Sequence, residues 1–148
     1  MKRQMLLCFL FAGILIAGCK KSTPPPESFG VLPAERQLQW QELEMISIVH
    51  FGLNTFTDKE WGYGDVDPKV FDPVDFNPEQ IVSAAKSAGI KGLILVAKHH
   101  DGFCLWPTKT TDYNITQSPW EEGKGDMVKA FEEACKEQGI KFGLYCSP

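Results

Sequence analysis

Apolar residues in the second part of the chain form short runs that alternate with amphipathic segments. The longest run, residues 93–97, reads Leu-Ile-Leu-Val-Ala, which is typical of a strand buried on both faces. Residues 45–51 and 140–145 form similar runs. Apolar positions recur at helical spacing before the last two runs, over residues 77–88 and 126–138. The pattern predicts three strands, with a helix between each consecutive pair.

The ends of both predicted helices carry recognisable signals. Asn77 and Asp126 are good N-caps, and Gly89 and Gly139 are suited to end the two helices. Gly-Ile-Lys then occurs twice, at residues 89–91 and again at 139–141. A helix, a glycine and a strand that repeat in this order predict parallel strands joined by crossover helices.

Long irregular segments follow the predicted strands, at residues 53–76 and 107–124, whereas short connections precede them. Barrels of the (β/α)8 type build their sites from the loops after the strands. We therefore predict an α/β fold, the N-terminal portion (about three strands) of a (β/α)8 TIM-type barrel, rather than a doubly wound sheet. Because such a barrel needs about 250 residues, we expect the 148-residue chain to be truncated.

The start of the chain predicts export. Two basic residues precede an apolar core, residues 5–16, that is too short for a membrane span. The core ends in Leu-Ile-Ala-Gly before Cys19, which resembles a bacterial lipobox. We predict a lipoprotein signal peptide over residues 1–18 and lipidation of Cys19. A plain secretory signal and a chance apolar N-terminus are the alternatives.

A tether follows the predicted lipidation site. Residues 19–31 contain three consecutive prolines, which favour an extended polyproline conformation and do not pack into a core. We expect a lipid-anchored, Pro-rich tether there and the catalytic barrel over residues 32–148. The protein would be an exported bacterial lipoprotein on a periplasm-facing or cell-surface membrane.

Charge and cysteine content narrow the possible functions. The net charge is −4, and removal of residues 1–18 takes away two positive charges and no negative ones, which leaves −6. An acidic chain argues against nucleic-acid binding. Cys104, Cys135 and Cys146 would remain as thiols, and no Cys-x-x-C pair occurs. We expect these three thiols to be buried as small apolar side chains.

Parallel strands would bring several polar residues to one rim, because each residue lies at or after the end of a strand. These are His50, Glu60, Trp61, His99, His100 and Tyr145. Imidazoles, a carboxylate and an indole ring suit a sugar, whose hydroxyls take directed hydrogen bonds while a ring face lies on an aromatic side chain. A polar surface turn at residues 98–102 is the alternative without function.

Two other chemistries are less well supported by this set of residues. A metal site could use His50, His99 and His100, but adjacent residues of a strand point to opposite faces, so a twist would be needed to bring both neighbours inward. Cys104 could act as a nucleophile with a histidine, but no motif supports that pairing. The metal site stays open as an alternative.

Several motifs resemble the α-L-fucosidases of glycoside hydrolase family 29. They are His-Phe-Gly-Leu-Asn-Thr-Phe at residues 50–56, Glu-Trp-Gly at 60–62 and Lys-His-His-Asp-Gly-Phe-Cys-Leu-Trp at 98–106, with further agreement at 110–114 and 142–145. The resemblance covers residues 38–148. Residues 118–120 and 145–148 are more similar to the branch that prefers α-1,3 and α-1,4 linkages.

The resemblance implies a retaining exo-glycosidase that releases α-L-fucose from fucosylated glycans without a metal or another cofactor. It implies that the substrate is bound by His50, Glu60, Trp61, His99 and His100, with Tyr145 as a further candidate. The nucleophile and the acid/base of the family would lie beyond Pro148, so we expect the isolated chain to be inactive. The alternatives are a metal-dependent barrel hydrolase and a non-catalytic surface lipoprotein that binds fucosylated glycans. The oligomeric state stays open.

Overall fold

The computed structural model describes residues 23–148 and divides the chain into two units, Met1–Pro33 and Ala34–Pro148. The predicted signal peptide over residues 1–18 and the predicted lipidation site Cys19 lie outside the described residues. In the first unit, residues 23–33 are exposed and form neither helix nor strand. Over the described residues, no helix is both long and apolar enough to cross a lipid bilayer.

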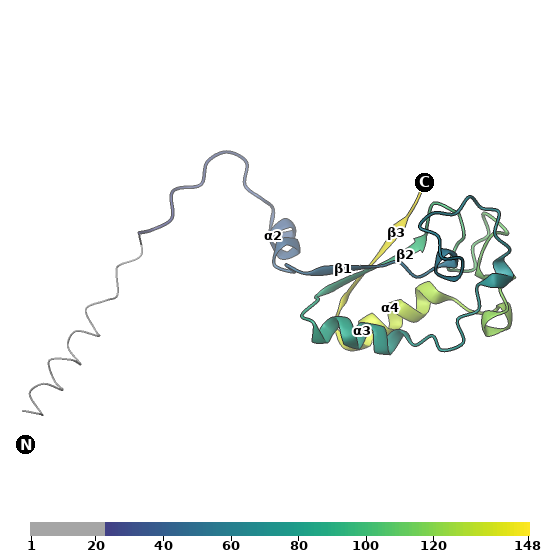
Figure 1. Ribbon diagram of the computed structural model, residues 1–148. Coiled ribbons are helices and arrows are strands. Elements are labelled where there is room, and N and C mark those ends of the chain that lie inside the picture. Colours follow the sequence, from purple (N-terminus) through teal and green to yellow (C-terminus); the bar gives the residue numbers. More distant parts are fainter. Residues whose placement is uncertain (1–22) are drawn as a thin grey trace, which may run out of the picture. The chain divides into compact units, whose positions relative to one another are not determined.

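The second unit contains a three-stranded parallel sheet (Figure 1). Its strands are β1 (Ile46–Val49), β2 (Gly92–Lys98) and β3 (Lys141–Cys146), in the spatial order β1-β2-β3. Helix α3 (Pro78–Ser87) connects β1 with β2, and α4 (Met127–Gln138) connects β2 with β3, while the short helix α2 (Glu35–Gln41) precedes β1. The predicted α/β class with three parallel strands is therefore confirmed.

The helix caps are formed by the residues that the sequence indicates. The Asn77 side chain accepts a hydrogen bond from the Gln80 amide at 2.8 Å, and the Asp126 side chain accepts one from the Lys129 amide at 2.9 Å. Gly139 ends α4 with φ of 72°. The end of α3 differs by one residue, because Ala88 is the C-cap and the left-handed residue Gly89 follows it.

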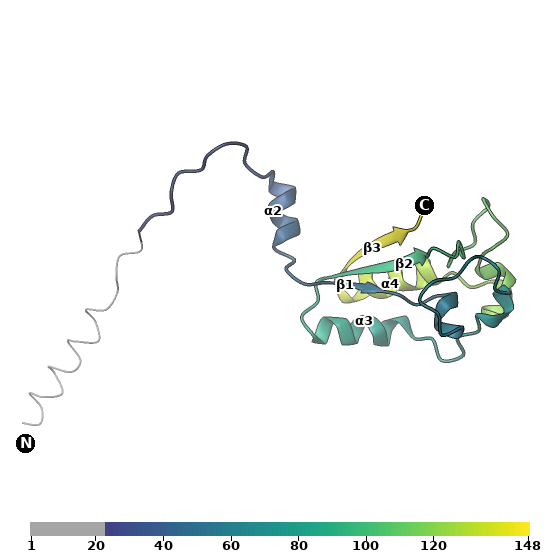
Figure 2. The same ribbon diagram turned by 45° about the horizontal axis from the view of Figure 1, so that its top comes forward.

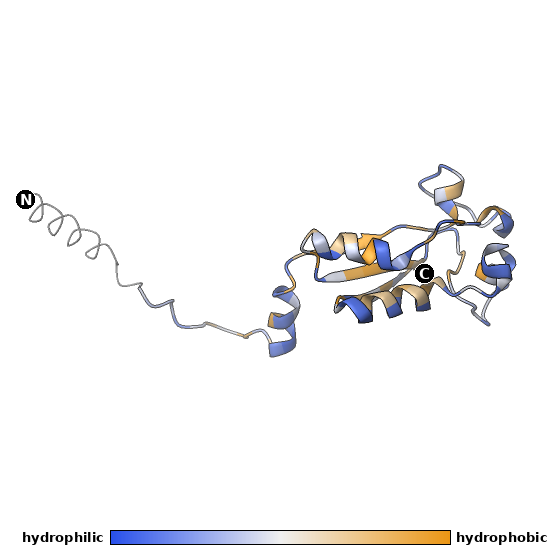
Figure 3. Ribbon diagram, turned by 90° about the horizontal axis from the view of Figure 1, so that it is seen from below, coloured by the Kyte–Doolittle hydropathy of each residue, from blue (hydrophilic) through white to orange (hydrophobic). Residues whose placement is uncertain are grey.

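Both α3 and α4 cover the same face of the sheet (Figure 2). Leu93 and Leu95 alternate with residues of the other face and are buried in one core with Val82 of α3 and Phe131 of α4. Figure 3 shows apolar residues concentrated on the strands, while polar residues lie along the outer sides of the helices. On the opposite face, Ile48 is 53% exposed, whereas Val96 at the cavity end of β2 is buried.

The long segments after β1 and β2 are more regular than the sequence suggests. They contain four short 3-10 helices: η1 (Leu53–Phe56), η2 (Pro68–Val70), η3 (Ile115–Gln117) and η4 (Trp120–Gly123). Asp67 and Asn114 cap η2 and η3 by accepting hydrogen bonds from backbone amides. Beneath these turns Phe71 and Phe103 are buried, with ring centroids 5.5 Å apart. This packing extends the core beyond the ends of the strands and supports the loops there.

Burial of the three thiols is confirmed for two of them and wrong for the third. Cys104 and Cys135 are buried, and burial raises the pKa of both thiols, which makes them poor nucleophiles at neutral pH. Cys146 is exposed, because it ends β3 and β3 is an edge strand within the described sheet.

Candidate functional site

A cavity of about 480 Å³ lies where β1 and β2 end. All five residues predicted to bind substrate line it, although they come from segments 50 residues apart in the chain. Parallel pairing of the two strands explains this convergence, since it brings their C-terminal ends to the same edge of the sheet. The lining consists of His50, Phe51, Gly52, Leu53, Asn54, Thr55, Lys59, Glu60, Trp61, Val96, His99, His100, Asp101, Phe103 and Leu105.

The three imidazoles form a contiguous cluster. The ring centroids of His99 and His100 are 4.7 Å apart, and those of His50 and His99 are 5.6 Å apart. Both adjacent histidines line the cavity, because β2 ends at Lys98 and the alternation of strand side chains does not continue beyond it. They begin a turn that is closed by a hydrogen bond from the Gly102 amide to the His99 carbonyl, at 3.0 Å.

The surroundings of His99 change the pKa of its imidazole. Burial lowers its pKa below the usual 6.5, and the neighbouring His100 lowers it further. Its ring is therefore neutral at pH 7 and offers one N–H donor and one acceptor nitrogen. Among the described residues, none forms a hydrogen bond with its buried Nδ1 atom.

His100 is held by a residue that the sequence did not indicate. The buried Ser147 hydroxyl lies 3.1 Å from His100 Nδ1, and it also donates a hydrogen bond to the Tyr145 hydroxyl at 3.3 Å. Tyr145 is outside the cavity lining, so it reaches the site through Ser147. The position of Ser147 after the end of β3 is the signal that could have identified it.

Glu60 and Trp61 form the wall opposite β2. Trp61 is 59% exposed, and its ring centroid lies 6.1 Å from that of His100. The Asn54 side-chain amide donates to the Glu60 carbonyl at 3.0 Å and fixes the backbone at this point. Asn54 was not singled out from the sequence, although it lies within the motif at residues 50–56. Its role depends on the path of the loop.

Asp101 lies between the two walls and contacts both of them. It is 6% exposed, and its Oδ1 accepts a hydrogen bond from the Phe103 amide at 3.0 Å. A Cβ atom placed on Gly62 would lie 2.8 Å from Asp101 Cβ and 2.9 Å from Asn54 Oδ1. The loop after β1 can therefore approach Asp101 this closely only because residue 62 is a glycine.

The chemistry of the cavity suits a small polyhydroxylated ligand. Three imidazoles and two carboxylates supply directed hydrogen-bonding groups, and an indole ring supplies a flat apolar surface. Over residues 23–148, no group of three or more His, Cys, Asp or Glu side chains is arranged to hold a metal ion.

Comparisons with known proteins point to one family. A family model described as alpha-L-fucosidase matches residues 28–148. Over its whole length the chain is 46% identical to alpha-L-fucosidase 1 of Arabidopsis thaliana, and it spans 30% of that relative. The match therefore covers under a third of the length of this curated relative.

Solved structures give the same result. A glycoside hydrolase 29 family member from an unknown rumen bacterium matches with a TM-score of 0.80 and 48% identity, over 82% of this chain and 22% of that one. A Ruminococcus gnavus GH29 fucosidase in complex with fucose matches with a TM-score of 0.75 and 38% identity, over 86% of this chain and 26% of that one.

Proposed function

We propose, from the premise that this chain belongs to the alpha-L-fucosidase family, that the protein is an exo-acting glycosidase that releases α-L-fucose from fucosylated glycans. In this proposal residues 32–148 supply the wall of the active site that recognises fucose. His50, His99 and His100 hydrogen-bond the fucose hydroxyls together with Glu60, and Trp61 contacts the sugar ring.

The observation that carries the proposal is the convergence of these five residues on one cavity at the ends of β1 and β2. The structure of a similar fucosidase was solved with fucose bound, which supports a fucosylated substrate here. A neutral His99 fits this role, because a neutral imidazole can both donate to and accept from sugar hydroxyls.

We also propose that the three strands are the first three of a (β/α)8 barrel. The sequential order β1-β2-β3 supports this, as do the long segments that follow the strands. Both crossover helices cover one face of the sheet, as in a singly wound barrel, whereas a doubly wound sheet has helices on both faces (Figure 2).

Retaining hydrolysis needs two carboxyl groups about 5 Å apart, one as nucleophile and one as acid/base. Glu60 lines the cavity, but here it is assigned to substrate binding, and the buried Asp101 is committed to the Phe103 amide. We propose that the catalytic pair comes from another part of the protein. The 148-residue chain alone should bind fucose weakly and hydrolyse no aryl α-L-fucoside. Turnover by this chain that is lost in Glu60→Gln would contradict the assignment.

The location of the protein is proposed from the sequence alone. The apolar core at residues 5–16 and the small residues before Cys19 support cleavage by a lipoprotein signal peptidase and a lipid anchor. A Pro-rich tether over residues 19–31 would then separate the membrane from the catalytic part. Replacement of Cys19 by Ser should release the protein from the membrane fraction, which fractionation of the producing cells would reveal.

The test of the function compares two tryptophans in the complete gene product. Trp61 and Trp40 are both 59% exposed, but Trp40 lies on α2 outside the cavity. Trp61→Ala should reduce kcat/KM on an aryl α-L-fucoside at least tenfold, whereas the matched control Trp40→Ala should leave it unchanged. Wild-type protein without α-L-fucosidase activity would overturn the proposal, and loss of activity on chelation would favour a metal-dependent hydrolase instead.

A further inference from the structure

The sequence Trp-Gly-Tyr-Gly at residues 61–64 has an alternation that the fucose cavity does not explain. Gly62 is buried against Asp101 and Asn54, as described above. Gly64 also faces Asp101, since a Cβ atom there would lie 3.0 Å from the Asp101 carbonyl oxygen, and its φ of +75° favours glycine. Gly62 is buried and Gly64 is exposed, but both approach the same residue, Asp101.

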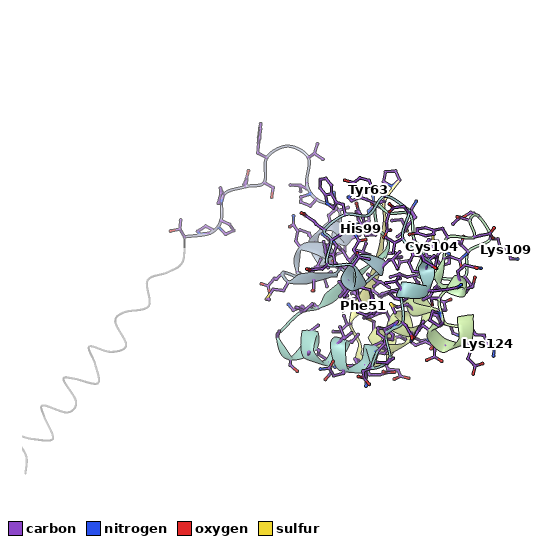
Figure 4. The ribbon with its side chains drawn as sticks, turned by 45° about the vertical axis from the view of Figure 1, so that its right-hand side comes forward. Phe51, Tyr63, His99, Cys104, Lys109 and Lys124 are labelled. Carbon is purple, nitrogen blue, oxygen red and sulfur yellow. The ribbon has the colours of Figure 1, made fainter. Side chains whose placement is uncertain are left out.

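The two aromatic residues of this strip have different surroundings. Trp61 lies at the cavity, beside His100, but Tyr63 is outside the cavity lining and is 85% exposed. Figure 4 shows Tyr63 and His99 in the same upper part of the fold, with Lys124 well away from them. The exposure of Tyr63 is not the result of a detached loop, because the backbone on either side of it lies close to the buried Asp101.

The spacing of the two rings indicates what Tyr63 could bind. Two residues along an extended chain span at most about 7 Å, so the backbone of Tyr63 lies within that distance of Trp61, the residue proposed to contact fucose. Within the described residues Tyr63 is 85% exposed, so its flat face is available for stacking on the apolar face of a sugar ring. Fucose in an oligosaccharide is attached to a further sugar, and that sugar must lie outside the cavity, at its opening, while fucose is bound.

We propose that Tyr63 is a stacking platform for the sugar to which fucose is attached, directly outside the fucose cavity. This inference rests on the proposed function, because it takes the cavity to be the fucose site. Tyr63 then recognises the remainder of the glycan, and the Gly62 and Gly64 contacts with Asp101 hold the platform at a fixed position relative to Trp61.

The test uses the complete gene product and two substrates that differ only beyond fucose. One is α-L-fucosyl fluoride, whose leaving group is a single atom, and the other is a fucosylated trisaccharide. Tyr63→Ala should raise KM for the trisaccharide about 3- to 10-fold, the range expected for one lost aromatic contact. It should leave kcat/KM for the fluoride unchanged. Tyr63→Phe should retain wild-type values, because it keeps the stacking face, and Trp40→Ala serves as the exposed aromatic control.

The outcomes separate the two proposals. If Tyr63→Ala lowers kcat/KM equally on both substrates, or does not affect the trisaccharide, the proposed role of Tyr63 is overturned. Hydrolysis of the fluoride by the wild type would still support the fucosidase function. Wild-type protein that hydrolyses neither substrate would overturn the proposed function instead. Free fucose is a product and is not turned over, so its calorimetric affinity should be the same in the wild type and in Tyr63→Ala.

Discussion

The two walls of the cavity are built by different means. The wall after β2 is fixed mainly by the backbone: the Leu105 amide donates to the Ala97 carbonyl at 2.9 Å, and the Ser147 amide donates to the Lys98 carbonyl at 2.9 Å. Buried side chains such as Phe103 lie directly behind it. The wall after β1 presents exposed Glu60 and Trp61, and it is held mainly through side chains and close approaches, such as the hydrogen bond from Asn54 and the approach of Gly62 to Asp101.

The two walls are therefore suited to different tasks: the wall after β2 fixes the orientation of its side chains, and the wall after β1 can move. Imidazoles on a backbone-bonded turn keep a fixed orientation, which directed hydrogen bonds to a ligand require. A wall with few buried contacts opens at a lower free-energy cost, so it is the wall expected to move when a ligand enters or leaves. Asp101 contacts both walls, and it is therefore the residue at which the comparison can be tested most directly.

The largest effect is expected from Asp101→Ala, because this change removes the buried carboxylate that holds the turn after β2. The buried Phe103 amide loses its acceptor, and the free energy of unfolding should fall by about 2–3 kcal/mol. Urea denaturation of the complete gene product measures this change. Asp101→Asn is the matched control, since it keeps the Oδ1 acceptor and should be clearly less destabilising. Equal losses in the two variants would show that the hydrogen bond is not what matters.

Gly62→Ala should affect only the wall after β1. The added methyl group would meet Asp101 Cβ and Asn54 Oδ1 at less than 3 Å, so the loop must shift outward at a cost of about 1–2 kcal/mol. We expect the affinity for fucose to fall about tenfold, which corresponds to about 1.4 kcal/mol, while the turn after β2 stays intact. Calorimetry gives the affinity, and amide hydrogen exchange reports on each wall separately.

Gly143→Ala is the control for this change, because a methyl group there would meet one atom of Ile94, at an ordinary distance of 3.4 Å. Gly143 lies in β3 and outside the cavity. If both alanine variants weaken fucose binding equally, the close approach of Gly62 to Asp101 has no special role in forming the site.

The same contrast explains which features could be predicted from the sequence. Caps at Asn77 and Asp126 depend on a few neighbouring residues, so the helices they begin were placed correctly. The repeated Gly-Ile-Lys indicated parallel strands, and parallel strands are sufficient to bring His50 and His99 to one edge. Secondary structure and topology therefore follow from local and periodic signals.

The remaining features depend on where an irregular segment runs in space. The bond from Asn54 to Glu60 and the packing of Gly62 on Asp101 come from a loop without periodicity, so no pattern indicates them. That the two adjacent histidines both line the cavity likewise depends on β2 ending at Lys98. Ser147 was missed because its contact with His100 depends on the path of the turn after β2.

The smallest effect is expected from pH, and it should be confined to the wall after β2. Burial and His100 lower the pKa of His99 in the folded state, whereas the unfolded chain keeps a value near 6.5. Between the lowered pKa and about 6.5 the unfolded state binds more protons, so the free energy of unfolding rises with pH across that window. Below it, both states are protonated and the slope from His99 disappears.

Urea denaturation of the wild type and of His99→Gln at several pH values between 4 and 8 isolates this contribution. Glutamine keeps a donor and an acceptor but does not titrate, so its curve should be flatter than that of the wild type in the window below 6.5. Identical slopes would show that His99 has the same pKa folded and unfolded. In that case the wall after β2 would be more accessible to water at His99 than its burial indicates, and the contrast between the two walls would be smaller there.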